Sequence, residues 1–191
     1  MRELVLRILL LVALAGPQTL WGGEPDCSAI NDATPIQPVG AFSNMRFTEE
    51  HAYGYTVELW QAQKCLFGLF ESSEGLAGDT PTGMLNHIHH DRPSGRLIFE
   101  ARLTMGITKP KNATDWVPSR DLFQFSGHLS DRVLRGKLTQ SDRLRPELSS
   151  VKQDIILPLS KPQQESMIQA ATYGEWRKQA ESILRARGPK W

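Results

Sequence analysis

The fold of this chain is decided by residues 97–105, which read Leu97-Ile98-Phe99-Glu100-Ala101-Arg102-Leu103-Thr104-Met105. Apolar side chains occupy every second position, and Ile98 with three polar side chains occupies the positions between them. Successive side chains of a strand point to opposite faces of a sheet. The pattern therefore predicts a β-strand with one buried face and one face that is mostly exposed to water.

The same alternation recurs on both sides of this strand. It predicts further strands over residues 53–60, 64–71, 82–90, 121–130, 132–140 and 151–159. Polar turns, such as residues 91–95 and 130–131, separate neighbouring strands as in hairpins. Gly127 and Gly136 lie inside strand patterns, where glycine indicates a bulge or a sharp bend. We therefore predict a mainly β domain over residues 51–160, a small antiparallel meander barrel or strongly curved sheet of about seven strands. A two-sheet β-sandwich is the alternative.

The two flanks of this domain have a different character. Residues 24–50 contain three prolines and few periodic apolar positions, which predicts an irregular N-terminal lead-in. Residues 161–188 are expected to be a C-terminal helical segment that packs against the barrel. Ser160 and Gln163 have the spacing of a capping box at its start. The apolar side chains at helical spacing are Tyr173, Trp176, Ala180, Ile183 and Leu184.

Residues 1–23 have the pattern of a signal peptide. Arg2 and Arg7 precede or flank an apolar run over residues 8–15, which is too short to span a bilayer. We therefore expect a secreted or periplasmic protein. In such an oxidising compartment Cys27 and Cys65 are expected to form a disulfide bond, and two separate buried thiols are the alternative.

The composition narrows the range of partners. The chain has 22 basic and 21 acidic side chains, so it lacks the basic excess that nucleic-acid binding requires. A second long apolar segment is also absent from the sequence. We therefore expect a monomer that binds an unknown small molecule or protein, with no nucleic acid and no membrane contact beyond export.

His87 and His89 are the candidate metal ligands. On a regular strand both side chains would lie on one face, where they could share a metal ion such as zinc. Further ligands would have to come from elsewhere, for example from His51, His128 or Glu100. The alternative is a solvated strand end beside a turn, and no cofactor is then predicted. Glu58 and Glu100 lie opposite the apolar faces of their strands, so both are expected to be solvated.

Four aromatic residues are the candidate ligand-binding residues. Tyr53, Tyr55 and Phe99 lie on predicted strands, where aromatic side chains could line an apolar pocket. Trp116 lies in the long segment 106–120 and could cover a ligand as part of a lid. In the alternative interpretation these rings fill the core or pack on the sheet.

Catalytic motifs are absent from the sequence. It contains no Gly-x-Ser-x-Gly, no His-Glu-x-x-His, no Cys-x-x-Cys and no phosphate-binding glycine loop. We therefore expect an exported, non-enzymatic binding or accessory protein. One alternative is a metal-binding protein or metal-dependent hydrolase that uses the pair His87 and His89. Another is a protein–protein interaction module that docks through the C-terminal helix.

Overall fold

The computed structural model describes residues 27–76 and 80–191. Its strands are β1 (Gln37–Ser43), β2 (Arg46–Phe47), β3 (His51–Ala62), β4 (Cys65–Leu76), β5 (Thr82–Asp91), β6 (Arg96–Leu103), β7 (Ile107–Thr108), β8 (Val117–Pro118), β9 (Asp121–Leu129), β10 (Val133–Asp142) and β11 (Val151–Pro158). The helices are α1 (Lys161–Ser166) and α2 (Tyr173–Arg187).

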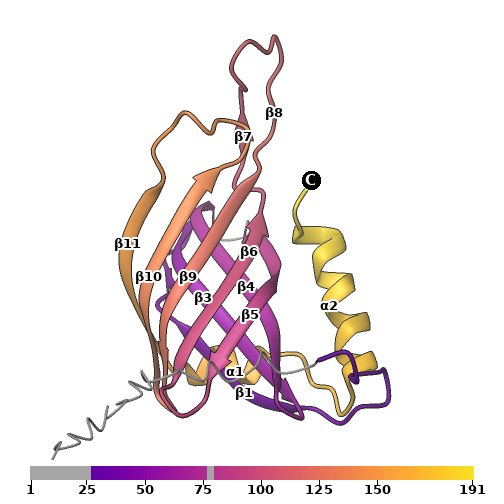
Figure 1. Cartoon of the computed structure of the whole chain (residues 1–191). Coiled ribbons are helices and arrows are strands. Elements are labelled where there is room, and N and C mark those ends of the chain that lie inside the picture. The colour runs from indigo at the N-terminus through magenta and orange to yellow at the C-terminus, as the bar shows by residue number, and fades with distance from the viewer. Residues whose placement is uncertain (1–26, 77–79) are drawn as a thin grey trace, which may run out of the picture.

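One antiparallel sheet contains most of the strands, in the order β1-β3-β4-β5-β6-β9-β10-β11, with β2 paired to β3 beside this path. The sheet is strongly curled, and α2 lies along its outside (Figure 1). The edge strands meet at one end, where Phe42 forms a bridge with Leu159 and the Ser160 N–H donates to the Ala41 carbonyl. The predicted fold class, a strongly curved antiparallel sheet with a C-terminal helix, is confirmed.

Along this path the strand that the sequence did not predict is β1, which makes eight strands rather than about seven; the two-residue strands β2, β7 and β8 were not predicted either. It lies within residues 24–50, where an irregular segment was expected. Pro38 and Gly40 interrupt the alternation of side chains, and the pairing with β3 shifts its register between these two residues. Proline is tolerated in an edge strand of this kind, because not every N–H there is needed by a neighbouring strand.

Packed aromatic side chains fill the interior of the curled sheet. The Phe99 and Phe125 rings stack with centroids 5.0 Å apart, and the Phe70 and Phe123 rings lie 5.1 Å apart. All four side chains are essentially inaccessible to solvent. The interior is therefore a hydrophobic core, as in small barrels whose inward side chains meet.

Gly127 and Gly136 face each other across β9 and β10 where the space is too small for a side chain. They pair directly across β9 and β10 without a shift of register, so the predicted irregularity is not a bulge. A Cβ atom on Gly127 would come within 2.2 Å of the Arg135 carbonyl oxygen, and one on Gly136 within 2.4 Å of the Ser126 carbonyl oxygen. Only glycine fits at either position without a local shift of the backbone.

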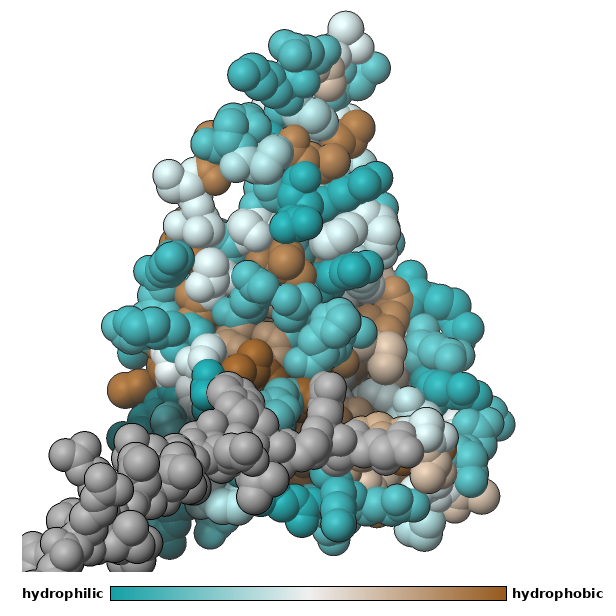
Figure 2. All heavy atoms as spheres, viewed as in Figure 1, coloured by the Kyte–Doolittle hydropathy of each residue, from teal (hydrophilic) through white to brown (hydrophobic). Residues whose placement is uncertain are grey.

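A second apolar cluster lies on the outer face of the sheet, beneath α2. Trp176 of the helix is fully buried, with its ring centroid 4.6 Å from that of Phe67 and 5.5 Å from that of Trp60. Ala180, one turn later, is also buried. The predicted apolar stripe of the helix is thus used within the chain, and the outward-facing side of α2 is mainly hydrophilic (Figure 2).

The capping box of the helical segment lies at a different place from the one predicted. Ser160 precedes α1 but its side chain caps no backbone N–H. At the start of α2, the Thr172 hydroxyl accepts from the Glu175 N–H and the Glu175 carboxylate accepts from the Thr172 N–H. The capping box is therefore carried by α2, the longer of the two helices.

Residues 27–36, which we call the N-terminal strap, join α2 to the sheet. The predicted disulfide between Cys27 and Cys65 is present, with the two Cα atoms 5.9 Å apart. At the other end of the strap the Gly174 N–H donates to the Asp32 carbonyl, and Arg177 forms an ion pair with the Asp32 carboxylate. The disulfide is consistent with an oxidising compartment.

The predicted signal peptide, residues 1–23, lies outside the described residues. Within residues 27–76 and 80–191, neither helix combines the length and the apolar character that crossing a bilayer requires.

Candidate functional site

The predicted aromatic ligand-binding residues do not converge on one site. Phe99 is packed in the interior, and Tyr55 lies there too, with its hydroxyl hydrogen-bonded to Gln153 at one end of the sheet. Tyr53 is 49% exposed on the surface of β3. Trp116 is 63% exposed in the arm formed by β7 and β8, which projects from the sheet (Figure 1). A ligand site that uses all four residues therefore has no support from their placement.

The two candidate metal ligands lie at an irregularity of β5. His87 has a positive φ of 49°, and the pairing with β6 shifts its register between Asn86 and His89. This irregularity breaks the alternation from which a shared face was predicted. No group of three or more His, Cys, Asp or Glu side chains that could hold a metal ion is found in the described part of the chain. The His87 and His89 metal site thus remains a prediction from sequence.

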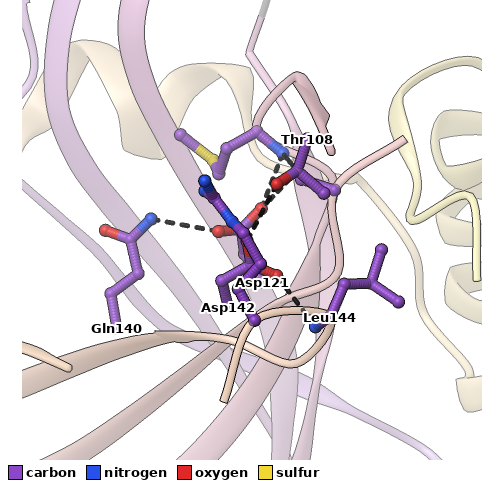
Figure 3. A network of polar contacts seen from close by, with 8 residues as sticks. Thr108, Asp121, Gln140, Asp142 and Leu144 are labelled. Carbon is purple, nitrogen blue, oxygen red and sulfur yellow. Dashed lines mark hydrogen bonds and ion pairs between the residues drawn. The ribbon is translucent and has the colours of Figure 1, made fainter. Parts of the chain in front are cut away.

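A polar network occupies the end of the sheet from which the β7–β8 arm projects, beside a pocket of about 570 Å³. Asp121 and Asp142 lie next to each other there, with Thr108, Gln140 and Leu144 around them (Figure 3). Asp121 accepts hydrogen bonds from the Met105 N–H, the Ser119 hydroxyl and the Gln140 amide.

The carboxylate of Asp142 likewise has several hydrogen-bond donors around it. It accepts from the Thr108 hydroxyl, the Leu144 N–H and the Arg145 guanidinium. Burial opposes its ionisation, but these hydrogen bonds, led by that from Arg145, outweigh burial and hold its pKa below the ordinary value. Both carboxylates therefore fix the loops at this end of the sheet and have little capacity left for a ligand.

Replacing Asp121 with asparagine tests this structural role. The amide keeps the shape of the side chain but removes a charged acceptor of three hydrogen bonds from a residue that is 6% exposed. We expect a loss of about 1–3 kcal/mol in the free energy of unfolding, measured by urea denaturation. Asp131→Asn, in an exposed turn, should change it by less than about 0.5 kcal/mol. Equal effects of the two substitutions would contradict the assignment.

The other candidate site is a groove of about 560 Å³ between α2 and the outer face of β3 and β4, which we call the helix groove. Its floor comes from the strands, one wall from the helix, and its ends from α1, β2 and neighbouring loops. The lining side chains are those of Met45, Phe47, Thr56, Glu58, Leu69, Glu71, Thr80, Gln163, Ser166, Ile168, Ser182, Ile183, Ala186 and Arg187.

Two carboxyl groups lie on the floor of the helix groove. Glu58 of β3 pairs with Leu69 of β4, and Thr56 pairs with Glu71. The two glutamates are therefore diagonal neighbours on one face of the sheet, and residues in this relation lie roughly 7–8 Å apart across the two strands. They come from adjacent strands and lie beside the outer apolar cluster that holds α2 in place.

Glu58 is the unusual member of this pair. Its side chain is only 8% exposed, yet within residues 27–76 and 80–191 it forms neither a hydrogen bond nor an ion pair. Burial, together with the nearby charge of Glu71, raises the pKa of Glu58 to about 8. At neutral pH this carboxyl is therefore mostly protonated and can donate a hydrogen bond, whereas it becomes a buried anion at higher pH.

Glu71 has partners that Glu58 lacks. Burial raises its pKa, but the nearby Arg187 guanidinium and a hydrogen bond from the Thr82 hydroxyl oppose this effect. Arg187 also donates to the Thr80 hydroxyl at 3.0 Å. The helix groove thus combines a partnered carboxyl, an unpartnered carboxyl, one cation and an apolar wall, which is the composition of a small-molecule site.

The expectation that Glu58 is solvated was wrong. The alternation of β3 correctly placed Glu58 on the face opposite the interior, but α2 covers that face. Glu100, for which the same expectation was made, is only partly buried and accepts a hydrogen bond from the Gln124 amide. The one sequence signal that could have separated the two glutamates is Trp60, two residues after Glu58 on the same face, which indicates an apolar covering.

Comparison of the chain with known protein families, with curated proteins and with solved structures finds no match. The function must therefore be inferred from the geometry of the helix groove.

Proposed function

We propose that this chain is an exported binding protein that holds a small molecule in the helix groove. The observation that carries this proposal is Glu58, a residue only 8% exposed that lines the groove without a hydrogen-bond or ion-pair partner among the described residues. The carboxyl oxygens reach the solvent of the groove, so a ligand there can supply the partner that the protein does not. Export is supported by the pattern of residues 1–23 and by the disulfide between Cys27 and Cys65.

The placement of the groove explains why a ligand would bind outside the curled sheet. The interior is occupied by aromatic side chains, whereas the groove has a volume of about 560 Å³, within the range of ligand pockets. Its mixed lining provides Leu69 and Ile183 for apolar contact and Thr56 and Glu58 for hydrogen bonds. Because Trp176 anchors α2 beside it, the site is largely formed before any ligand enters.

Binding of the neutral fluorophore N-phenyl-1-naphthylamine tests this site. We expect saturable, one-site enhancement of its fluorescence with the protein that has its disulfide intact. Ser182→Trp introduces a large ring at the groove wall and should weaken binding by about 5- to 150-fold, because overpacking costs about 1–3 kcal/mol.

Lys178→Trp is the matched control for this experiment. Lys178 is exposed on the same helix but does not line the groove, so this variant should bind the dye as the parent protein does. Unchanged binding by Ser182→Trp, or no saturable signal with the parent protein, would overturn the proposal.

A further inference from the structure

We infer that the ligand of the helix groove is a small organic cation, an amine with an apolar body, whose ammonium group pairs with Glu58. This inference rests on the function proposed above and specifies the chemistry of its ligand.

The charges of the groove lead to this conclusion. Among the described residues, three charged side chains line it, namely Glu58, Glu71 and Arg187. Arg187 is the nearby cation for Glu71, as its effect on that carboxyl shows. Glu58 has no cation of its own within the described residues, and the negative charge of Glu71 acts on it instead. One positive charge is therefore missing from the groove when Glu58 is ionised.

The apolar side chains of the lining indicate that the rest of such a ligand is apolar. Leu69, Ile168 and Ile183 line the groove together with Met45 and Phe47 from its rim. These side chains would cover an alkyl or aryl group of the ligand, while its ammonium group would lie against the carboxyl of Glu58. The Thr56 hydroxyl, which already bonds to the Ser43 hydroxyl at 2.8 Å, and Ser166 are further polar groups of the lining.

Binding of a cation at Glu58 must release a proton. The carboxyl is mostly protonated below pH 8, and an ion pair with the ammonium group requires the carboxylate. The proton leaves for solvent and no covalent bond of the ligand changes. In the part of the chain that the structure describes, Glu71 from β4 and Arg187 from α2 are the other charged groups of the lining, and the lining contributed by α1 is uncharged.

Calorimetric titration with n-octylammonium tests the inference. An alkylammonium group titrates like a lysine, near pH 10.4, and so remains a cation at both pH 6 and pH 9. With a pKa of about 8, Glu58 is about 1% ionised at pH 6 and about 90% ionised at pH 9. We therefore expect roughly 100-fold tighter binding at pH 9, with about one proton released per ligand at pH 6.

Two probes of equal chain length and two variants complete the experiment. 1-Octanol and octanoate should bind more weakly than n-octylammonium at pH 9. Glu58→Gln should abolish the pH dependence of amine binding and reduce its affinity to that for 1-octanol. Glu71→Gln is the matched control, which should keep the pH dependence and move it to lower pH, because Glu71 contributes to the raised pKa of Glu58.

The outcomes separate this inference from the proposed function. Tight binding of octanol or octanoate that weakens in Ser182→Trp would overturn the cation inference and leave the groove as a ligand site. If Glu58→Gln binds the amine as tightly as the parent protein does, the cation inference is likewise overturned and the groove remains a ligand site. If none of the three probes binds to the parent protein but N-phenyl-1-naphthylamine does, the cation inference alone is overturned; if the dye does not bind either, both proposals are overturned.

Discussion

Replacing Trp176 with alanine is expected to lower the free energy of unfolding by about 3–5 kcal/mol. The indole ring is fully buried between α2 and the outer face of the sheet, against Trp60, Phe67 and Tyr173. Its removal leaves a cavity that two large rings of the sheet cannot close. Urea denaturation followed by circular dichroism measures the loss.

Trp176→Phe separates the packing of the ring from its polar atom. The indole N–H is buried without a hydrogen-bond partner, so phenylalanine removes an unsatisfied donor while it keeps most of the apolar contact. We expect this variant to retain most of the stability that alanine loses. Trp116→Ala, at an exposed position of the β7–β8 arm, should change stability by less than about 0.5 kcal/mol. A small effect of Trp176→Ala would show that α2 is held by other contacts.

Glu58→Gln is expected to change how the stability of the ligand-free protein depends on pH. The pKa of Glu58 is about 8 in the folded state, against an ordinary value of 4.5. Between these two pH values the folded protein binds more protons than the unfolded chain, so its stability falls as the pH rises. The contribution of Glu58 is fully present below pH 4.5 and is lost by about pH 8.

The size of this effect follows from the same linkage. Glu58 lowers the free energy of unfolding by about 1.4 kcal/mol for each pH unit between about pH 5 and pH 8, or about 4–5 kcal/mol in all. The variant cannot ionise and should lack this part of the slope. Urea denaturation of both proteins at pH 5, 7 and 9 measures the difference. Parallel pH profiles would contradict the assignment of a buried, protonated carboxyl.

Much of the fold followed from local patterns. The alternation of residues 97–105 predicted β6, because a strand with one buried face has this period and no other regular structure does. The spacing of Trp176 and Ala180 predicted the buried side of α2. The disulfide followed from the number of cysteines and the signal-peptide pattern. In each case the relevant information lies within one segment or in a simple count.

The helix groove could not be predicted in this way. Its floor belongs to β3 and β4 and its wall to α2, which lies far along the chain. The strand pattern gives the face on which Glu58 lies, but whether that face meets water or a helix depends on tertiary packing. The irregularity at His87 was missed for a related reason, since a non-glycine residue with positive φ leaves no reliable mark in the sequence.

The N-terminal strap and α2 have a consequence for how the protein matures. The strap is synthesised long before the helix, yet the Gly174 N–H of the helix donates a hydrogen bond to the Asp32 carbonyl of the strap. Until α2 docks, Glu58 lies on an uncovered strand face and is ionised at neutral pH. The docked helix forms a wall of the groove that holds this carboxyl, whose pKa is about 8 in the folded protein, so folding at neutral pH is expected to take up about one proton. Maturation should therefore finish more readily in a mildly acidic compartment than in an alkaline one.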